Sequence, residues 1–310
     1  MNILVSAPYF QPVIERFRPE FERRGLTMVI PEVNERLEEE DLLRYVGNIH
    51  GILCGDDRIT PRVVDAAPHL RVVVKWGTGV DSIDATALGA RGIPLRRTPN
   101  AFSEPVADSV IGYSLDHIRR LGAMTTAMRG GEWEKIPGRT LAECTVGIIG
   151  MGDVGYAVAR RLFAFGATIL AADIRPIDHA RTTPFGVQMV SLQELLNRSD
   201  IVTLHADLNP SSYRILNGDT FAMMRPGTYV INTARGPHIH EAALIDALQS
   251  GHLGGAALDV FEHEPLPDDS PLRHFPNVHM APHNANSSPR AWENVHLNSL
   301  RMLFESLGVP

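Results

Sequence analysis

Two separate series of short apolar segments, spaced by amphipathic stretches, set the strongest limit on how this chain of 310 residues folds. The first series lies at 2–6, 26–30, 51–54, 71–75 and 93–97. The second series lies at 145–150, 167–173, 200–206, 227–234 and 254–260. Short strands that alternate with helical segments are typical of parallel sheets joined by right-handed crossovers. The sequence therefore predicts an α/β protein with two doubly wound parallel sheets.

A long helical stretch lies between the two series. Residues 106–128 carry apolar side chains at helical spacing, and Ser103 and Pro105 before them are typical of a helix start. A last helical segment, 289–307, follows the final predicted strand and can pack back on the first sheet. We therefore expect one domain inserted into another, with 1–98 plus 286–310 forming the outer domain and 99–285 the inserted one.

Residues 145–155 read TVGIIGMGDVG, an apolar strand followed by three glycines. In such a loop the first glycine permits a tight turn, the second lets the backbone approach a pyrophosphate, and the third allows the helix to pack closely on the strand. The N-terminus of the following helix then faces the anion. The pattern predicts a dinucleotide site whose loop residues are Gly150, Gly152, Asp153, Val154 and Gly155.

Asp173 ends the next predicted strand after the glycine loop. A carboxylate in this place can accept hydrogen bonds from both ribose hydroxyls and repels a 2′-phosphate. We therefore expect NAD rather than NADP as the cofactor. Arg175 is an opposing signal, because its guanidinium could tolerate the phosphate of NADP.

Composition argues against several classes of partner. The chain carries 29 Lys and Arg against 36 Asp and Glu, for a net charge of −7, which disfavours nucleic acid and anionic membrane as partners. No apolar run approaches the roughly 20 residues of a membrane-spanning helix, and no signal-peptide pattern is visible, so we expect a cytoplasmic protein. Cys54 and Cys144, the only two cysteines, lie in apolar stretches and are expected to be buried thiols.

Several later motifs carry a family resemblance. They are NTARG at 232–236, GAALDVF at 255–261, EP at 264–265, PNV at 276–278 and APH at 281–283. Two earlier segments match as well, KWGTGVDSID at 75–84 and TPNAFSEPVAD at 98–108. On these motifs the chain resembles the D-isomer-specific 2-hydroxyacid dehydrogenases over nearly its whole length. Within that family, KWGTGVDSID and RGGEWEK at 129–135 are most similar to 3-phosphoglycerate dehydrogenases without a regulatory domain.

The resemblance implies a fold and a reaction. It implies a Rossmann NAD-binding domain inserted into a flavodoxin-like substrate domain. It also implies an NAD-dependent enzyme that transfers a hydride between the nicotinamide and a small D-2-hydroxy acid, running reversibly as a 2-keto acid reductase. The partner is then a small anionic 2-hydroxy or 2-keto acid.

The resemblance gives catalytic roles to three residues that lie far apart in the sequence. Arg235 matches the arginine that binds the substrate carboxylate, for which a guanidinium is a bidentate partner. His283 matches the acid/base group, which accepts the hydroxyl proton as neutral imidazole and returns it as imidazolium. Glu264 matches the carboxylate that holds this imidazole and favours its charged form, with Glu262 as the nearby alternative.

The resemblance also implies further contacts. Thr78 and Gly79 are expected to offer backbone N–H groups to the substrate carboxylate, and Lys75 is a basic position that can bind an anion. Asp259 matches the residue that accepts from the nicotinamide amide. The remaining residues expected along the cofactor are His205, Thr233, Ala234 and Ala285.

Other features bear on substrate and assembly. Cys54 stands where 3-phosphoglycerate dehydrogenases carry a phosphate-binding arginine, and Asn284 stands where the family usually has a hydrophobic residue, so the substrate stays open. The family usually forms homodimers, and the 106–128 helix with the segment after it is the expected contact. No third ligand accompanies the histidine pairs of this chain, so no metal site is expected.

Two alternatives stay open at this point. Proteins of the same fold family that bind NAD(H) to sense redox state, and act through protein partners, can retain Arg235, Glu264 and His283. A third group of relatives takes the hydride from a small anion such as formate or phosphite. Turnover assays on a substrate panel discriminate between these possibilities.

Overall fold

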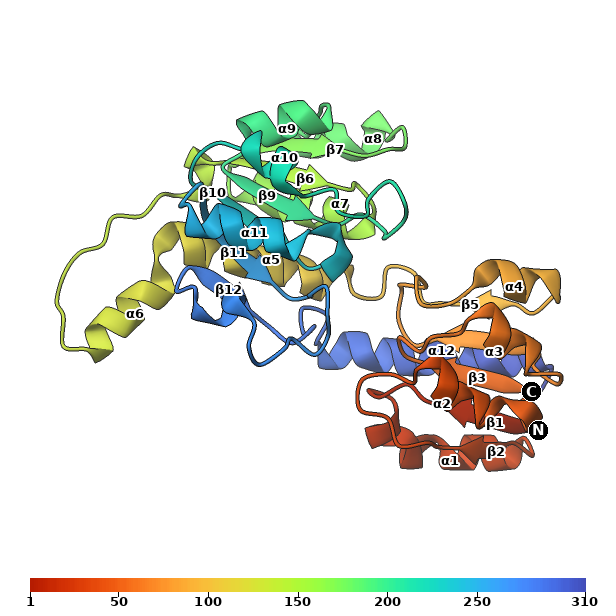
Figure 1. Ribbon diagram of the computed structural model, residues 1–310. Helices are drawn as coiled ribbons and strands as arrows, with labels where there is room; N and C mark the ends of the chain where they lie inside the picture. The colour runs from red at the N-terminus through yellow and green to blue at the C-terminus, as the bar shows by residue number, and fades with distance from the viewer. The chain divides into compact units, whose positions relative to one another are not determined.

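A computed structural model describes residues 1–310 and divides the chain into two compact units (Figure 1). Unit 1 consists of Met1–Phe102 and Ser288–Pro310, and unit 2 consists of Ser103–Ser287. The boundaries expected after residues 98 and 285 lie a few residues before these. The chain of unit 2 is therefore an insertion within the chain of unit 1.

The sheet of unit 1 has five parallel strands in the order β2-β1-β3-β4-β5. The strands are β1 Asn2–Val5, β2 Thr27–Val29, β3 Gly51–Cys54, β4 Val72–Lys75 and β5 Leu95–Arg96. All five lie within the apolar segments from which they were predicted. This strand order is that of flavodoxin-like folds, so the predicted fold class of the outer domain is confirmed.

Helices cover both faces of this sheet, and alternate strand residues pack against each set. One face carries α1 (Ile14–Arg23) and α12 (Pro289–Leu307), and the other carries α2 (Glu39–Leu43), α3 (Pro61–Asp65) and α4 (Ala85–Ala90). The helix α12 has the predicted bounds and lies close against β3, where a Cβ on Gly51 would be 3.1 Å from Cδ1 of Leu303. The end of the chain thus returns to complete the core of unit 1.

The sheet of unit 2 has seven parallel strands in the order β12-β11-β10-β9-β6-β7-β8. The strands are β6 Thr145–Ile149, β7 Thr168–Ala172, β8 Gln188–Met189, β9 Ile201–Leu204, β10 Thr228–Asn232, β11 Leu253–Leu258 and β12 Val278–Met280. The first strand of the unit, β6, lies inside the sheet between β7 and β9, as in dinucleotide-binding folds, so the predicted Rossmann class is confirmed. The two short strands β8 and β12 were not predicted.

Helices also flank both faces of the second sheet. The helices of unit 2 are α5 Ser103–Arg119, α6 Leu121–Arg129, α7 Asp153–Ala164, α8 His179–Thr182, α9 Leu192–Arg198, α10 Gly218–Ala222 and α11 Glu241–Gln249. α5 and α7 pack on one face, and α9, α10 and α11 pack on the other. Short 3-10 helices occur at Gln11–Val13, Val46–Asn48, Leu141–Glu143, Thr183–Phe185, Gly236–His238 and Pro271–His274.

The single helix predicted over 106–128 is wrong, because the chain breaks between α5 and α6. Arg120, at the break, has the left-handed φ of +57°. Asp116 fixes the break, since its Oδ1 accepts the N–H of Gly122 at 3.0 Å. α6 contains no buried residue, and in Figure 1 it projects away from the sheet of unit 2.

A polar cluster links the end of α5 to β10 and β12. The Tyr229 hydroxyl lies 2.9 Å from Nδ1 of His279, whose Nε2 lies 2.5 Å from Oδ2 of Asp116. The ring of His117 stacks on Tyr229 at a centroid distance of 3.8 Å. Burial lowers the pKa of His117 to about 4 and raises that of Tyr229, so both rings are neutral at neutral pH.

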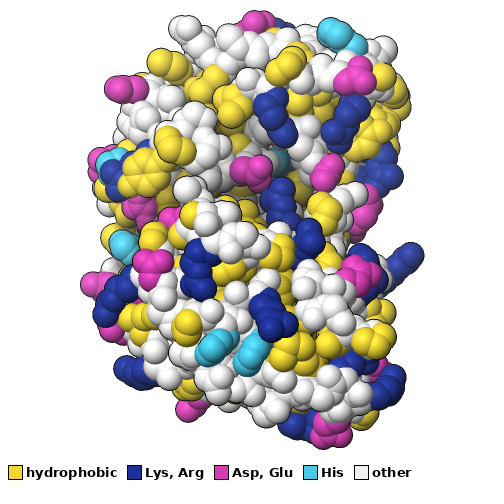
Figure 2. Space-filling view, turned by 90° about the vertical axis from the view of Figure 1, so that its right-hand side faces the viewer, with side chains coloured by type: hydrophobic (Ala, Val, Ile, Leu, Met, Phe, Trp, Pro, Cys, Tyr) yellow, Lys and Arg dark blue, Asp and Glu magenta, His cyan; other side chains and the backbone are white.

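Charged side chains of both signs are interspersed on the face shown in Figure 2. Several form surface ion pairs, including Arg16–Glu293 at 2.8 Å and Arg18–Glu15 at 2.6 Å. Cys54 and Cys144 are both buried thiols. None of the helices combines the length and the apolar composition that a bilayer crossing requires.

We expect His117→Phe to weaken the acid sensitivity of the fold. The pKa of His117 is about 4 in the folded protein and 6.5 when unperturbed, so unfolding takes up a proton between these values. The free energy of unfolding therefore includes the full contribution of neutral His117 above pH 6.5. This contribution is lost as the pH falls toward about 4, and it amounts to about 1–2 kcal/mol after allowing for partial exposure. Urea unfolding at about pH 7 and about pH 5 measures the difference. His179→Gln, on an exposed position, is the matched control, and an equal pH effect in both variants would contradict the assignment.

Candidate active site

Each glycine of the loop between β6 and α7 meets a different constraint. Gly150 has φ +96°, and a Cβ there would lie 2.6 Å from the backbone nitrogen of Ala206. A Cβ on Gly155 would lie 2.1 Å from the carbonyl oxygen of Gly150. Gly152 is the N-cap of α7, and the nearest atom to its Cβ position is Nη2 of Arg175 at 4.0 Å. The packing of the protein itself therefore requires Gly150 and Gly155, whereas Gly152 leaves open space before the helix.

Asp173 ties the end of β7 to this loop. Its Oδ2 accepts the N–H of Met151 at 2.8 Å, and its Oδ1 accepts the N–H of Arg175 at 2.9 Å. The Arg175 guanidinium lies 3.2 Å from each carboxylate oxygen. Burial opposes ionisation of this carboxyl, but the hydrogen bonds from Arg175 and Met151 outweigh burial and lower the pKa of Asp173. Arg175, the opposing signal in the sequence, is thus paired with the carboxylate.

The residues at the ends of β6 and β10 fit a dinucleotide. The N–H groups in the first turn of α7 have no helical partner, which suits a pyrophosphate next to Gly152. The Thr233 hydroxyl, one residue beyond β10, is buried and has no hydrogen-bond partner. Such an atom costs about 1–3 kcal/mol unless a ligand or water bonds to it. Both features suit NAD as the bound group.

His205 lies one residue beyond β9 and is neutral. Its Nε2 lies 2.8 Å from the Thr203 hydroxyl, and burial lowers the pKa of its ring to about 3. The backbone of His205 and Ala206 is the surface against which Gly150 packs. This segment therefore shapes the glycine loop, a contact that the sequence pattern did not reveal.

His283 and Glu264 form a hydrogen-bonded pair. Nδ1 of His283 lies 3.1 Å from Oε2 of Glu264, while Oε1 of Glu264 accepts the N–H of Phe261 at 3.0 Å. About a quarter of the His283 side chain and a third of the Glu264 side chain are exposed, at 27% and 31%. His283 has the left-handed φ of +52°. The hydrogen bond at Nδ1 thus fixes the orientation of the ring.

Asp259 holds the backbone that carries His283. The carbonyl oxygen of Asp259 accepts the N–H of His283 at 2.7 Å, and its carboxylate accepts the N–H groups of Asn284 at 2.7 Å and Ala285 at 2.9 Å. Asp259 is 1% exposed. Burial raises the pKa of its carboxyl, and the two backbone N–H groups oppose that rise. Sequence reasoning expected a cofactor contact here and missed this anchoring of the histidine loop.

The turn that carries Glu264 is held from a second side by α11 and the segment before it. A Cβ on Gly236 would lie 1.8 Å from the carbonyl oxygen of Phe261, so only glycine fits there. The carboxylate of Glu241 accepts the N–H of Glu262, and Arg214 lies 3.2 Å from the carboxylate of Glu262. Glu262, the alternative to Glu264, is therefore engaged with Arg214, whereas Glu264 is the residue on the histidine.

Arg235 lies at the end of the strand beside these residues. It follows β10, which is adjacent to β11, and β11 is adjacent to β12. Its carbonyl oxygen accepts the side-chain N–H of Asn232 at 2.8 Å, and its Nη1 donates to the carbonyl oxygen of Ala234 at 2.8 Å. The carboxyl ends of three neighbouring strands thus carry Arg235, Asp259 and His283.

The candidate substrate residues of unit 1 follow β4. Lys75 is 4% exposed, and its Nζ lies 2.7 Å from Oδ1 of Asp56. The Thr78 hydroxyl donates to the carbonyl oxygen of Thr98 at 3.0 Å. The N–H groups of Thr78 and Gly79 make no hydrogen bond within the protein. Two unused donors therefore lie side by side in the GTG turn.

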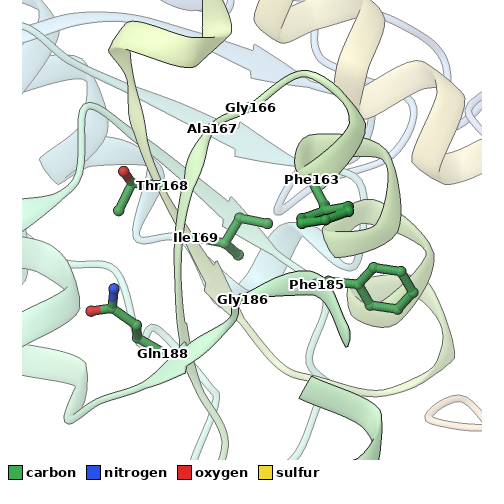
Figure 3. A pocket seen from close by; sticks show the side chains of 8 residues that line it. All are labelled: Phe163, Gly166, Ala167, Thr168, Ile169, Phe185, Gly186 and Gln188. Atoms are coloured by element: carbon green, nitrogen blue, oxygen red, sulfur yellow. The ribbon is translucent and has the colours of Figure 1, made fainter. Parts of the chain in front are cut away.

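A shallow pocket in unit 2 lies away from these residues (Figure 3). Phe163, Ile169, Phe185 and Gln188 are among its lining residues. It is at the amino end of β7, whereas the glycine loop and Asp173 are at the carboxyl ends of β6 and β7. No group of three His, Cys, Asp or Glu side chains that could hold a metal ion occurs in the structure.

Comparisons with known proteins match these observations. Residues 111–285 match the family model described as D-isomer specific 2-hydroxyacid dehydrogenase, NAD binding domain. A glyoxylate reductase of Thermofilum pendens is 38% identical over 81% of this chain and 76% of its own. A D-3-phosphoglycerate dehydrogenase of Homo sapiens is 38% identical over 83% of this chain and 48% of its own. The crystal structure of the TT0316 protein of Thermus thermophilus matches with a TM-score of 0.87 and 33% identity, covering 99% of this chain and 97% of its own.

We expect Gly152→Ala and Gly155→Ala to fail in different ways. The Cβ at 152 meets no protein atom closer than 4.0 Å, so that variant should fold normally and bind NADH at least about tenfold more weakly. The Cβ at 155 collides with a backbone oxygen, so that variant should lose about 2 kcal/mol or more of stability. Thermal unfolding without cofactor and NADH fluorescence titration separate the two effects. Unchanged NADH affinity in Gly152→Ala would count against the proposed place of the pyrophosphate.

Proposed function

Because the chain belongs to the D-isomer specific 2-hydroxyacid dehydrogenase family, and is an NAD-dependent oxidoreductase that interconverts 2-hydroxy and 2-keto acids, we propose that it acts on a small D-2-hydroxy acid and reduces the corresponding 2-keto acid. The hydrogen bond of 3.1 Å between His283 and Glu264 is the observation that carries this proposal. It supplies an oriented acid/base group at the carboxyl end of a parallel sheet, where ligands of such sheets bind.

We propose that Nε2 of His283 exchanges the substrate proton. The hydrogen bond between Nδ1 and Glu264 orients the ring, and Nε2 is proposed to face the hydroxyl group of the substrate. During oxidation the neutral ring accepts the hydroxyl proton, and during reduction the imidazolium donates it to the forming hydroxyl. The carboxylate of Glu264 stabilises the imidazolium between the two steps. NAD, when bound, supplies the hydride acceptor.

Arg235 is proposed to bind the carboxylate of the substrate. A guanidinium donates two parallel N–H groups to a carboxylate, and this pairing fixes the neighbouring carbonyl carbon in position. In unit 1, the N–H groups of Thr78 and Gly79, which have no acceptor in the protein, are proposed as donors to a substrate carboxylate. Lys75 is the last of the proposed substrate residues, and in the structure its ammonium group is paired with Asp56.

The cofactor is proposed to lie along the carboxyl ends of β6, β7, β9, β10 and β11. Gly150, Gly152, Asp153, Val154 and Gly155 form its loop at the pyrophosphate. Asp173 is proposed to accept the ribose hydroxyls, and the ratio of turnover with NADH to that with NADPH reports on this role. The other proposed contacts are His205, Thr233, Ala234, Asp259 and Ala285.

We propose that the protein forms a homodimer through α5, α6 and the segment after α6. Trp133 in that segment is 87% exposed, and Leu121 and Met128 of α6 are 45% and 52% exposed. Apolar side chains of this size on a projecting segment favour a protein partner. Size-exclusion chromatography should give a mass near twice 34.1 kDa, and a species of 34.1 kDa would contradict the proposal.

We expect His283→Gln to abolish turnover and to retain NADH binding. Removal of a general acid/base costs about a hundredfold or more in rate, while the cofactor's proposed contacts lie mainly on other residues. NADH oxidation is measured with glyoxylate, hydroxypyruvate, 2-ketoglutarate and phosphohydroxypyruvate, and NADH affinity by fluorescence titration.

The wild-type protein in the same assay tests the function itself. Turnover of at least one of these acids is the expected result. NADH binding without turnover of any acid would favour the alternative of an NAD(H)-sensing protein that acts through partners, and formate and phosphite as added donors test the remaining alternative.

A further inference from the structure

Three charged side chains gather at the carboxyl ends of β3 and β4 in unit 1. Lys75 is the last residue of β4, and Asp56 and Asp57 lie two and three residues after the end of β3. Nζ of Lys75 lies 2.7 Å from Oδ1 of Asp56, and the two side chains are 5% and 45% exposed. Because β3 and β4 are adjacent parallel strands, this cluster lies at the edge of the sheet where ligands bind.

The cluster has no surplus positive charge. Asp57 is fully buried, and its carboxylate accepts the N–H of Leu37 at 2.7 Å and the hydroxyl of Ser6. Burial raises the pKa of Asp57 to about 6, so this carboxyl is largely ionised at neutral pH. Two carboxylates therefore face one ammonium, and Lys75 is already neutralised by Asp56.

The neighbouring Cys54 supplies no positive charge for a substrate phosphate. Cys54 is a buried thiol whose pKa is raised by burial, so it carries no charge. Arg97, which is exposed, donates through Nη1 to the carbonyl oxygen of Thr78 at 3.1 Å. A phosphate dianion at these strand ends would be repelled by the carboxylates of Asp56 and Asp57. Near a protein surface the effective dielectric constant is lower than in bulk water, so this repulsion is several times stronger there.

We propose that Asp56, by neutralising Lys75, restricts the enzyme to 2-keto acids whose only charge is the carboxylate. Glyoxylate and hydroxypyruvate belong to this class, and phosphohydroxypyruvate is excluded by its phosphate. This inference rests on the proposed function and gives it a substrate class.

The first test compares hydroxypyruvate with phosphohydroxypyruvate, which differ in one phosphoryl group. The wild-type holoenzyme with NADH should show kcat/KM at least about tenfold higher for hydroxypyruvate, because the phosphate meets a carboxylate rather than a free cation. A preference for phosphohydroxypyruvate overturns the proposal, and this comparison needs no variant to fold. Loss of that preference in Arg97→Gln would then assign phosphate binding to Arg97.

The second test changes the charge. Asp56→Asn keeps a hydrogen-bond acceptor for Lys75 and frees its charge, so kcat/KM for phosphohydroxypyruvate should rise about tenfold while that for glyoxylate changes much less. The double variant Asp56→Asn with Lys75→Met should lose this gain. Glu15→Gln is the matched control, because it makes the same change in net charge at an exposed ion pair with Arg18. Raised salt should reduce the gain.

The outcomes separate this inference from the proposed function. A gain that is selective for the dianion, present in Asp56→Asn and absent from the double variant and from Glu15→Gln, supports the inference. Equal changes for both substrates, or the same gain in Glu15→Gln, overturn it and leave the proposed function intact. A wild-type enzyme that turns over no 2-keto acid overturns both.

Discussion

Asp259 is the residue on which the geometry of the candidate site depends. Its carbonyl oxygen and both carboxylate oxygens accept three consecutive backbone N–H groups, those of residues 283, 284 and 285. These bonds hold His283 in a left-handed conformation that a non-glycine residue rarely adopts. Because this buried carboxyl, 1% exposed, accepts two backbone N–H groups, the rigid end of β11 fixes the loop that carries the imidazole.

Glu264 acts on the same ring from a turn that is held independently. Gly236 lets the segment after β10 pack against the Phe261 carbonyl, and Glu241 binds the next N–H of the turn. The acid/base pair thus joins two loops whose positions are set by different neighbours. A small shift in either loop would lengthen the 3.1 Å hydrogen bond between Glu264 and His283. Gly236, Glu241 and Asp259 therefore matter for the chemistry because they fix the two loops.

Much of the fold could be predicted from the sequence, because short apolar segments alternate with amphipathic helices. Two strands escaped prediction, since Gln188–Met189 and Val278–Met280 are too short to show a pattern and exist through pairing with β7 and β11. The break at Arg120 also escaped, because Asp116 reaches forward to an N–H group only in the folded chain. The Glu264–His283 pair was anticipated through motifs, whereas the pairs Arg175–Asp173 and Lys75–Asp56 needed coordinates.

The insertion of unit 2 has a consequence for biosynthesis. Val295, Leu303 and Phe304 of α12 belong to the core of unit 1, yet they are translated after every residue of unit 2. On the ribosome, the first 102 residues must wait with one face of their sheet covered by α1 alone, while the inserted unit already has all of its strands. Folding of the inner unit brings the two halves of the outer one together, since it replaces the flexible span of residues 103–287 with a fixed connection.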